Sequence, residues 1–197
     1  AIYKVSKGDQ RLTQVSTFMT GRFDAWGTLL RNRYAAAGVS QYTHTTVRDE
    51  HYLIGATDWD GSSPNSTSSL YHFNESSGHL KLLQEIDTFG ARRWLFFSVD
   101  DTLLAAVANH NGPSAIYKCS VRPRDASDPS STEMLSLQTA DALRLPILAA
   151  SSVTAFAVED AQYLLFSTLY DSMVPEQSSL SVLYRVRKEI DGSVTAT

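Results

Sequence analysis

The stretch Ala115-Ile116-Tyr117-Lys118-Cys119 decides the fold, because its pattern occurs four times along the chain. Each copy has an isoleucine or leucine, then a tyrosine, then a basic residue or histidine, then an apolar residue. The other copies are Ala1-Ile2-Tyr3-Lys4-Val5, Ser69-Leu70-Tyr71-His72-Phe73 and Val182-Leu183-Tyr184-Arg185-Val186. Short runs of this composition are typical of strands. A strand that recurs in this way indicates a repeat protein.

A second motif precedes the last three copies and predicts a hairpin. A valine is followed two residues later by an aspartate and five residues later by a tyrosine or leucine. The three copies are Val47-Arg48-Asp49-Glu50-His51-Tyr52-Leu53, Val99-Asp100-Asp101-Thr102-Leu103-Leu104-Ala105 and Val158-Glu159-Asp160-Ala161-Gln162-Tyr163-Leu164. We expect one strand to end at the valine, an acidic turn to reverse the chain, and the next strand to begin before the tyrosine or leucine.

A third element lies between the tyrosine strand and the hairpin, and its clearest copy spans residues 83–97. Its N-terminal counterpart runs from Thr13 to Trp26, since Thr20 and Trp26 have the same spacing as Thr88 and Trp94. A degenerate copy begins at Leu137. Residues 138–150 have a helix-friendly composition that Pro146 interrupts, so one short helix is expected there.

A unit of about 46 residues with four short strands is typical of a β-propeller blade. We therefore predict one all-β propeller region over residues 1–197, with approximate repeats at 1–73, 74–119 and 120–186. Neighbouring blades would stack face to face, with tyrosine, tryptophan and phenylalanine side chains between them. A non-repeating sandwich or jelly roll is the alternative, although it would not explain the recurring sequence.

Composition excludes several classes of protein. The chain has 197 residues, of which 43% are hydrophobic and 19% charged, which is an ordinary globular balance. Its net charge of −4 argues against a nucleic-acid partner. Apolar runs reach about six residues, whereas a membrane-spanning helix needs about twenty. The single cysteine, Cys119, excludes an internal disulfide and a cysteine-based zinc site within one chain.

The repeat resembles the epitempin repeat, also called EPTP or EAR. The resemblance rests on Gln84-x-Ile86-x-Thr88-x-Gly90-Ala91-x-x-Trp94-x-x-Phe97, then Leu104-Ala105-x-Val107-Ala108-Asn109, then Ser114-x-Ile116-Tyr117-Lys118. This family implies an extracellular, seven-bladed β-propeller that binds proteins and is not an enzyme. Leucine-rich glioma-inactivated proteins and an adhesion-receptor ectodomain are members.

The chain departs from the family pattern because it contains three full units and parts of others. It is a piece of a longer propeller, or it completes a ring with other copies, or it is a small divergent propeller. Three blades alone would leave two aromatic faces and open sheet edges in water. We therefore expect residues 1–5 and the segment after Val186 to contact other polypeptide, either another copy or the rest of a longer chain.

Signals for catalysis are weak. The acidic pairs could be read as carboxylates for glycoside hydrolysis, but they recur at the same place in each repeat. A turn repeats with the blade, whereas a catalytic pair would occur once. The pairs are Asp49-Glu50, Asp100-Asp101 and Glu159-Asp160. His44 and His51 could approach one another across a hairpin, either as ordinary surface histidines or as a metal pair.

The residues that we expect to bind a partner are Trp59 and its neighbours Asp58 and Asp60. Trp59 does not repeat and begins a polar loop, so an exposed indole there would serve as an anchor for a protein or a sugar. Inward carboxylates, including Asp24, would suit a calcium ion in a propeller channel. No other cofactor is indicated.

Asn65-Ser66-Thr67 and Asn74-Glu75-Ser76 are glycosylation sequons in loop-like sequence. Together with the family resemblance they favour an extracellular, secreted or cell-surface location. The predicted function is a non-enzymatic module that binds an extracellular or cell-surface protein. A lectin-like glycan-binding propeller is the alternative, and a propeller glycoside hydrolase is the third hypothesis.

Overall fold

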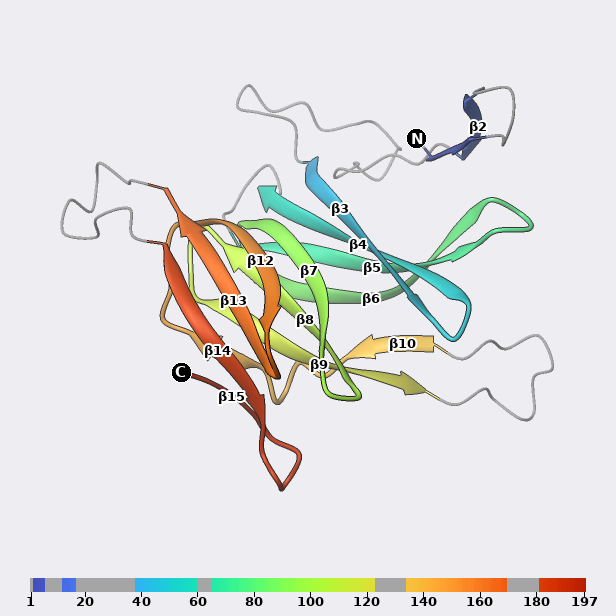
Figure 1. Cartoon of the computed structure of the whole chain (residues 1–197). Coiled ribbons are helices and arrows are strands. Elements are labelled where there is room, and N and C mark those ends of the chain that lie inside the picture. The colour runs from blue at the N-terminus through green and yellow to red at the C-terminus, as the bar shows by residue number, and fades with distance from the viewer. Residues whose placement is uncertain (1, 6–11, 17–37, 60–64, 123–133, 170–180) are drawn as a thin grey trace.

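The computed structural model describes residues 2–5, 12–16, 38–59, 65–122, 134–169 and 181–197 (Figure 1). Every regular element in these ranges is a strand, so the prediction of an all-β chain is confirmed. A two-stranded hairpin pairs β1 (Ile2–Val5) with β2 (Leu12–Ser16). The remaining strands form three antiparallel sheets that follow one another along the chain.

The first sheet contains β3 (Gly38–Val47), β4 (Glu50–Trp59), β5 (Asn65–Asn74) and β6 (His79–Phe89), paired in that order. The second sheet contains β7 (Ala91–Val99), β8 (Thr102–Asn109), β9 (Ser114–Arg122), β10 (Met134–Leu137) and β11 (Leu143–Leu145). The third sheet contains β12 (Ala150–Val158), β13 (Ala161–Thr168), β14 (Val182–Lys188) and β15 (Val194–Ala196). Each sheet is thus a meander of the kind that makes a propeller blade.

The acidic turns are the ones that the sequence predicts. In each sheet the first strand ends at the motif valine, and two residues connect it to the second strand. Two-residue hairpins require a positive φ at the first turn residue, or at both. Arg48 and Asp49 have φ of 51° and 66°, and Asp100 and Glu159 each have φ of 52°. The acidic pairs therefore lie at hairpin turns, as their repetition indicated.

The strand register confirms that three of the tyrosines are equivalent. Tyr71, Tyr117 and Tyr184 each lie on the third strand of a sheet, and their partners on the second strand are Leu53, Ala105 and Leu164. Each partner is six positions after its motif valine. Tyr3 lies on β1, where it pairs with Gln14.

A tyrosine occupies the position of Trp94 in the first sheet. Trp94 pairs with Val107, and the corresponding pair in the first sheet is Tyr42 with Gly55. Trp26 lies outside the described residues, so its match to Trp94 stays a prediction.

The short helix expected at residues 138–150 is wrong. The outer edge of β9 pairs first with β10 and then with β11, so two short strands replace the continuous β6 of the first sheet. Pro146 follows β11 and lacks the backbone N–H that would continue a ladder. The chain then passes through Ala149, whose φ is 53°, into β12.

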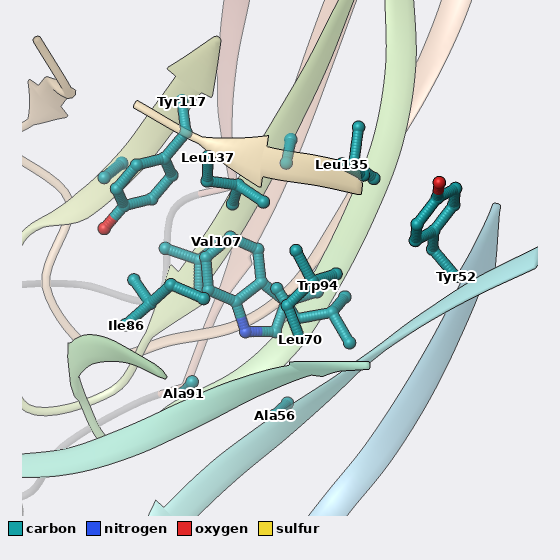
Figure 2. Packing of buried hydrophobic residues seen from close by; sticks show 13 residues of the cluster. Tyr52, Ala56, Leu70, Ile86, Ala91, Trp94, Val107, Tyr117, Leu135 and Leu137 are labelled. Carbon is teal, nitrogen blue, oxygen red and sulfur yellow. The ribbon is translucent and has the colours of Figure 1, made fainter. Parts of the chain in front are cut away.

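Two hydrophobic cores lie between neighbouring sheets. The first core joins the first and second sheets through Tyr52, Ile54, Trp94 and Tyr117 among others, and Figure 2 shows the Trp94 indole among Leu70, Ile86 and Val107. The second core joins the second and third sheets.

Strand β8 contributes to both cores. Ala105 and Val107 belong to the first core, whereas Leu104, Ala106 and Ala108 belong to the second. Successive side chains of a strand point to opposite faces, so an unbroken apolar run indicates burial on both sides. The second sheet is therefore packed between two others.

Candidate interaction face

The third sheet has one covered face and one open face. Val153, Leu164, Phe166 and Val186 lie on the covered face and belong to the second core. The alternate residues of the same strands point the other way. Among them, Phe156 is 40% exposed, and Val158 and Leu183 are each 52% exposed. Exposed apolar side chains gathered on one sheet face are typical of an interaction surface.

The register shows that the second sheet buries all three of these positions and that the first sheet buries one of them. By hairpin and tyrosine register, Phe156, Val158 and Leu183 correspond to Phe97, Val99 and Ile116 of the second sheet. Those three residues are only 7%, 7% and 2% exposed, because the third sheet packs on them. In the first sheet the position of Leu183 is Leu70, which is fully buried against the second sheet. The open face thus has the residues of a face that packs on a neighbouring sheet, and no sheet covers it among the described residues.

An aromatic pair lies at one side of this face. Phe156 on β12 and Tyr163 on β13 are directly opposite each other, with ring centroids 5.5 Å apart and planes at 14°. Arg185 on β14 pairs with Tyr163 and is exposed. Flat aromatic area bordered by an arginine is the composition that protein–protein interfaces favour.

Two of the three residues predicted to bind a partner, Asp58 and Trp59, lie at the end of β4. Asp58 forms an ion pair with Arg92 of β7, with Oδ1 and Nε 3.0 Å apart, and so connects the first and second sheets. The backbone of Trp59 pairs with Gly38 as the last residue of β4, and its side chain is outside the described part of the structure. Asp60, like Asp24, also lies outside the described residues.

The two sequon asparagines occupy different local structures. Asn65 begins β5 and pairs with Phe89, so the loop expected there ends earlier than the sequence suggests. Asn74 ends β5 at an exposed turn. Its Oδ1 accepts hydrogen bonds from the Ser76 hydroxyl at 2.7 Å and from the backbone N–H of Ser77 at 3.0 Å.

Within the described residues, no group of three or more histidine, cysteine, aspartate or glutamate side chains converges on a common point. Burial raises the pKa of the Cys119 thiol to about 12, so it is protonated at neutral pH. Cys119 is partly buried and packs against the first core.

Sequence reasoning expected exposed aromatic faces on an incomplete ring but did not identify the residues of the open face. The sequence of β12 does place two apolar residues, Phe156 and Val158, on one face of the strand, because they are two positions apart. The other face of β12 is also apolar, and the sequence does not show which of the two faces is covered. That distinction requires the register of all three sheets.

Searching the described residues for a helix able to span a bilayer finds none.

Stacked antiparallel sheets with a repeated register define an all-β repeat protein, and this arrangement is consistent with a β-propeller. Residues 80–118 match the family model described as EPTP domain. The match runs from β6 through most of β9, so it crosses from the first sheet into the second.

A mouse (Mus musculus) protein described as thrombospondin-type laminin G domain and EAR repeat-containing protein is 35% identical over 86 residues. This similarity covers 43% of the chain and 13% of the mouse protein. Both similarities support the EPTP/EAR repeat family over the part of the chain that they cover.

Proposed function

We propose that the chain is a non-enzymatic, extracellular protein-interaction module whose sheets are blades of a larger β-propeller. Its partner in this proposal is an extracellular or cell-surface protein. The observation that carries the larger propeller is the open face of the third sheet, where Phe156, Val158 and Leu183 are exposed at positions that the second sheet buries. The similarity to the EPTP/EAR family supports the protein-interaction function.

The occupant of the open face is a further EAR-type sheet, in cis or from another copy. The first and second sheets pack this face against the next sheet along the chain, so the complementary surface is that of the same repeat. A side chain of this size contributes roughly 1.5–3 kcal/mol when it is fully buried. Leaving several of them in water opposes a free third sheet, whereas one more sheet removes them from water and completes the stacking.

The extracellular location rests on the family and on the sequons. We propose Asn74 and Asn65 as glycosylation sites. The Ser76 hydroxyl already contacts the Asn74 amide in an exposed turn, where a glycan disturbs no core. The chain secreted from cultured cells should lose mass on enzymatic deglycosylation, and Asn74→Gln should remove one glycan. Secretion without any glycan would contradict this part of the proposal.

The segment from Asp58 to Asp60 is proposed as a second contact point for the partner protein. Asp58 is committed to Arg92, which leaves Trp59 as the residue to test. We expect Trp59→Ala to weaken partner binding without changing the association of sheets.

The experiment for the open face compares two exposed apolar residues of the third sheet. Leu183 lies on the open face, whereas Ile190, at 107% exposure, lies at the tip of the β14–β15 hairpin. The chain at a range of concentrations is studied by light scattering, alone and with added EAR repeats. Leu183→Asp should abolish association, and Ile190→Asp should leave it unchanged.

The partner is then sought on arrays of extracellular proteins and of glycans. Binding to a protein ligand supports the proposal. A chain that stays monomeric with and without added repeats overturns the docking of a further sheet, and binding only to glycans overturns the protein-interaction function.

A further inference from the structure

Two histidines contact each other on the β3–β4 hairpin of the first sheet. His44 Nε2 and His51 Nδ1 are 3.0 Å apart, and the two rings stack with centroids 5.2 Å apart. The Thr46 hydroxyl is 3.3 Å from the same His51 nitrogen. The side chain of His44 is exposed and that of His51 is partly exposed. The sequence expectation that these residues approach across a hairpin is thus confirmed.

The pair occurs only once among the three sheets. By register, the equivalent positions in the second sheet are Phe96 and Leu103, which pack against the first core. In the third sheet they are Ala155 and Gln162. A structural feature of the repeat would recur in every sheet. The histidine pair instead occurs in one sheet, at positions where the other two sheets have apolar residues or a glutamine.

We propose that His44 and His51 together bind a divalent transition-metal ion of the zinc and copper class. A hydrogen bond between two imidazole nitrogens requires a lone pair of one ring to point at the other nitrogen. A metal ion takes the place of the shared proton, and the ring that carried this proton changes tautomer. That ring loses the shared proton to solvent and takes one up at its other nitrogen, so both rings stay neutral. Metal–nitrogen bonds of about 2.0–2.1 Å at a tetrahedral angle place two nitrogens roughly 3.3 Å apart, so the rings need to separate by only a few tenths of an ångström.

The chemistry of the donors selects the ion. Imidazole nitrogen suits zinc, copper and nickel, whereas calcium and magnesium prefer oxygen ligands. A metal ion binds the neutral form of imidazole. Two protein ligands leave the remaining coordination positions to water or to a residue of a partner. The site is separate from the open face of the third sheet and does not depend on the function proposed above.

The test uses the untagged, metal-free chain, titrated calorimetrically with zinc chloride and, separately, with copper(II) chloride. We expect one ion per chain. His44→Gln and His51→Gln should each weaken binding by about tenfold or more, since one of two protein ligands is lost. His79→Gln is the matched control, because His79 is exposed on β6 of the same sheet and takes no part in the pair.

Two spectroscopic readouts on the unmodified chain keep the result independent of any effect of substitution on folding. Zinc should shift the imidazole resonances of His44 and His51 and leave those of His79 unchanged. The copper(II) electron paramagnetic resonance spectrum should show coupling to two nitrogens, and to one in either variant. The proposal is overturned if neither ion binds at millimolar concentration, if both variants bind as well as the parent chain, or if the shifts fall on other histidines.

Discussion

Substituting Trp94 by alanine tests whether the sheets are held together by the first core. Trp94 is 1% exposed, its ring lies 5.4 Å from that of Tyr117, and its Nε1–H donates to the Ser68 hydroxyl at 3.0 Å. A buried aromatic side chain removes roughly 150–250 Å² from water, worth about 4–6 kcal/mol at 25 cal/mol per Å². Alanine retains part of this area, so we expect Trp94→Ala to cost about 3–5 kcal/mol.

Trp94→Phe separates the hydrogen bond from the packing. It removes the donor to Ser68, whose hydroxyl keeps its contact with Thr88 Oγ1 at 3.3 Å, so the cost should be about 1–2 kcal/mol. Unfolding in urea, followed by far-ultraviolet circular dichroism, measures both variants. Ile190→Ala at the exposed hairpin tip is the control. A loss below about 1 kcal/mol in Trp94→Ala would refute the inference that this residue joins two sheets.

Three further predictions concern single positions. Gly90→Ala should destabilise the chain by more than Gly192→Ala. Both glycines have positive φ, but only at position 90 would an added Cβ meet another atom, a side-chain nitrogen at 2.4 Å. Equal shifts of the melting temperature in the two variants would contradict this. Cys119, with its pKa raised to about 12, should react slowly with a thiol reagent at pH 8 and at once after unfolding, its rate rising with pH; an immediate reaction in the native chain would be inconsistent with burial. Gln84→Ala should cost roughly 1–3 kcal/mol, because its amide both donates to and accepts from the backbone of Leu137; an unchanged midpoint in urea would show that this bridge between sheets is dispensable.

Much of the fold could be predicted from the sequence, because local chemistry and repetition agree. A valine followed by acidic turn residues predicts a two-residue hairpin, and all three copies are hairpins. The recurring tyrosine predicts the third strand of each sheet, because a residue with the same neighbours and the same contacts tends to keep the same side chain. Tyr71, Tyr117 and Tyr184 accordingly share one register.

The helix expected at residues 138–150 shows where local composition misleads. These residues contain good helix formers, but pairing with the edge of β9 outweighs a weak local preference. The sequence did not show that Tyr42 occupies the position of Trp94 in the first sheet, since a strand accepts any large side chain that fills the same volume. Exposed apolar faces were expected on an incomplete ring, but the residues of the open face were not predicted, because burial of a strand face depends on a neighbour far away in sequence.

The burial of strand β8 on both faces has a consequence for local opening of the chain and for amide exchange. Its amides are paired on both sides within the sheet, and both of its faces are covered, so they can exchange with solvent only when two cores open together. In a stack where each layer contacts only its neighbours, the end layer opens at the lowest free energy. Amide hydrogens of β8 should therefore exchange most slowly, and those of β12–β14 faster. Covering the open face should slow exchange in the third sheet to a rate nearer that of β8.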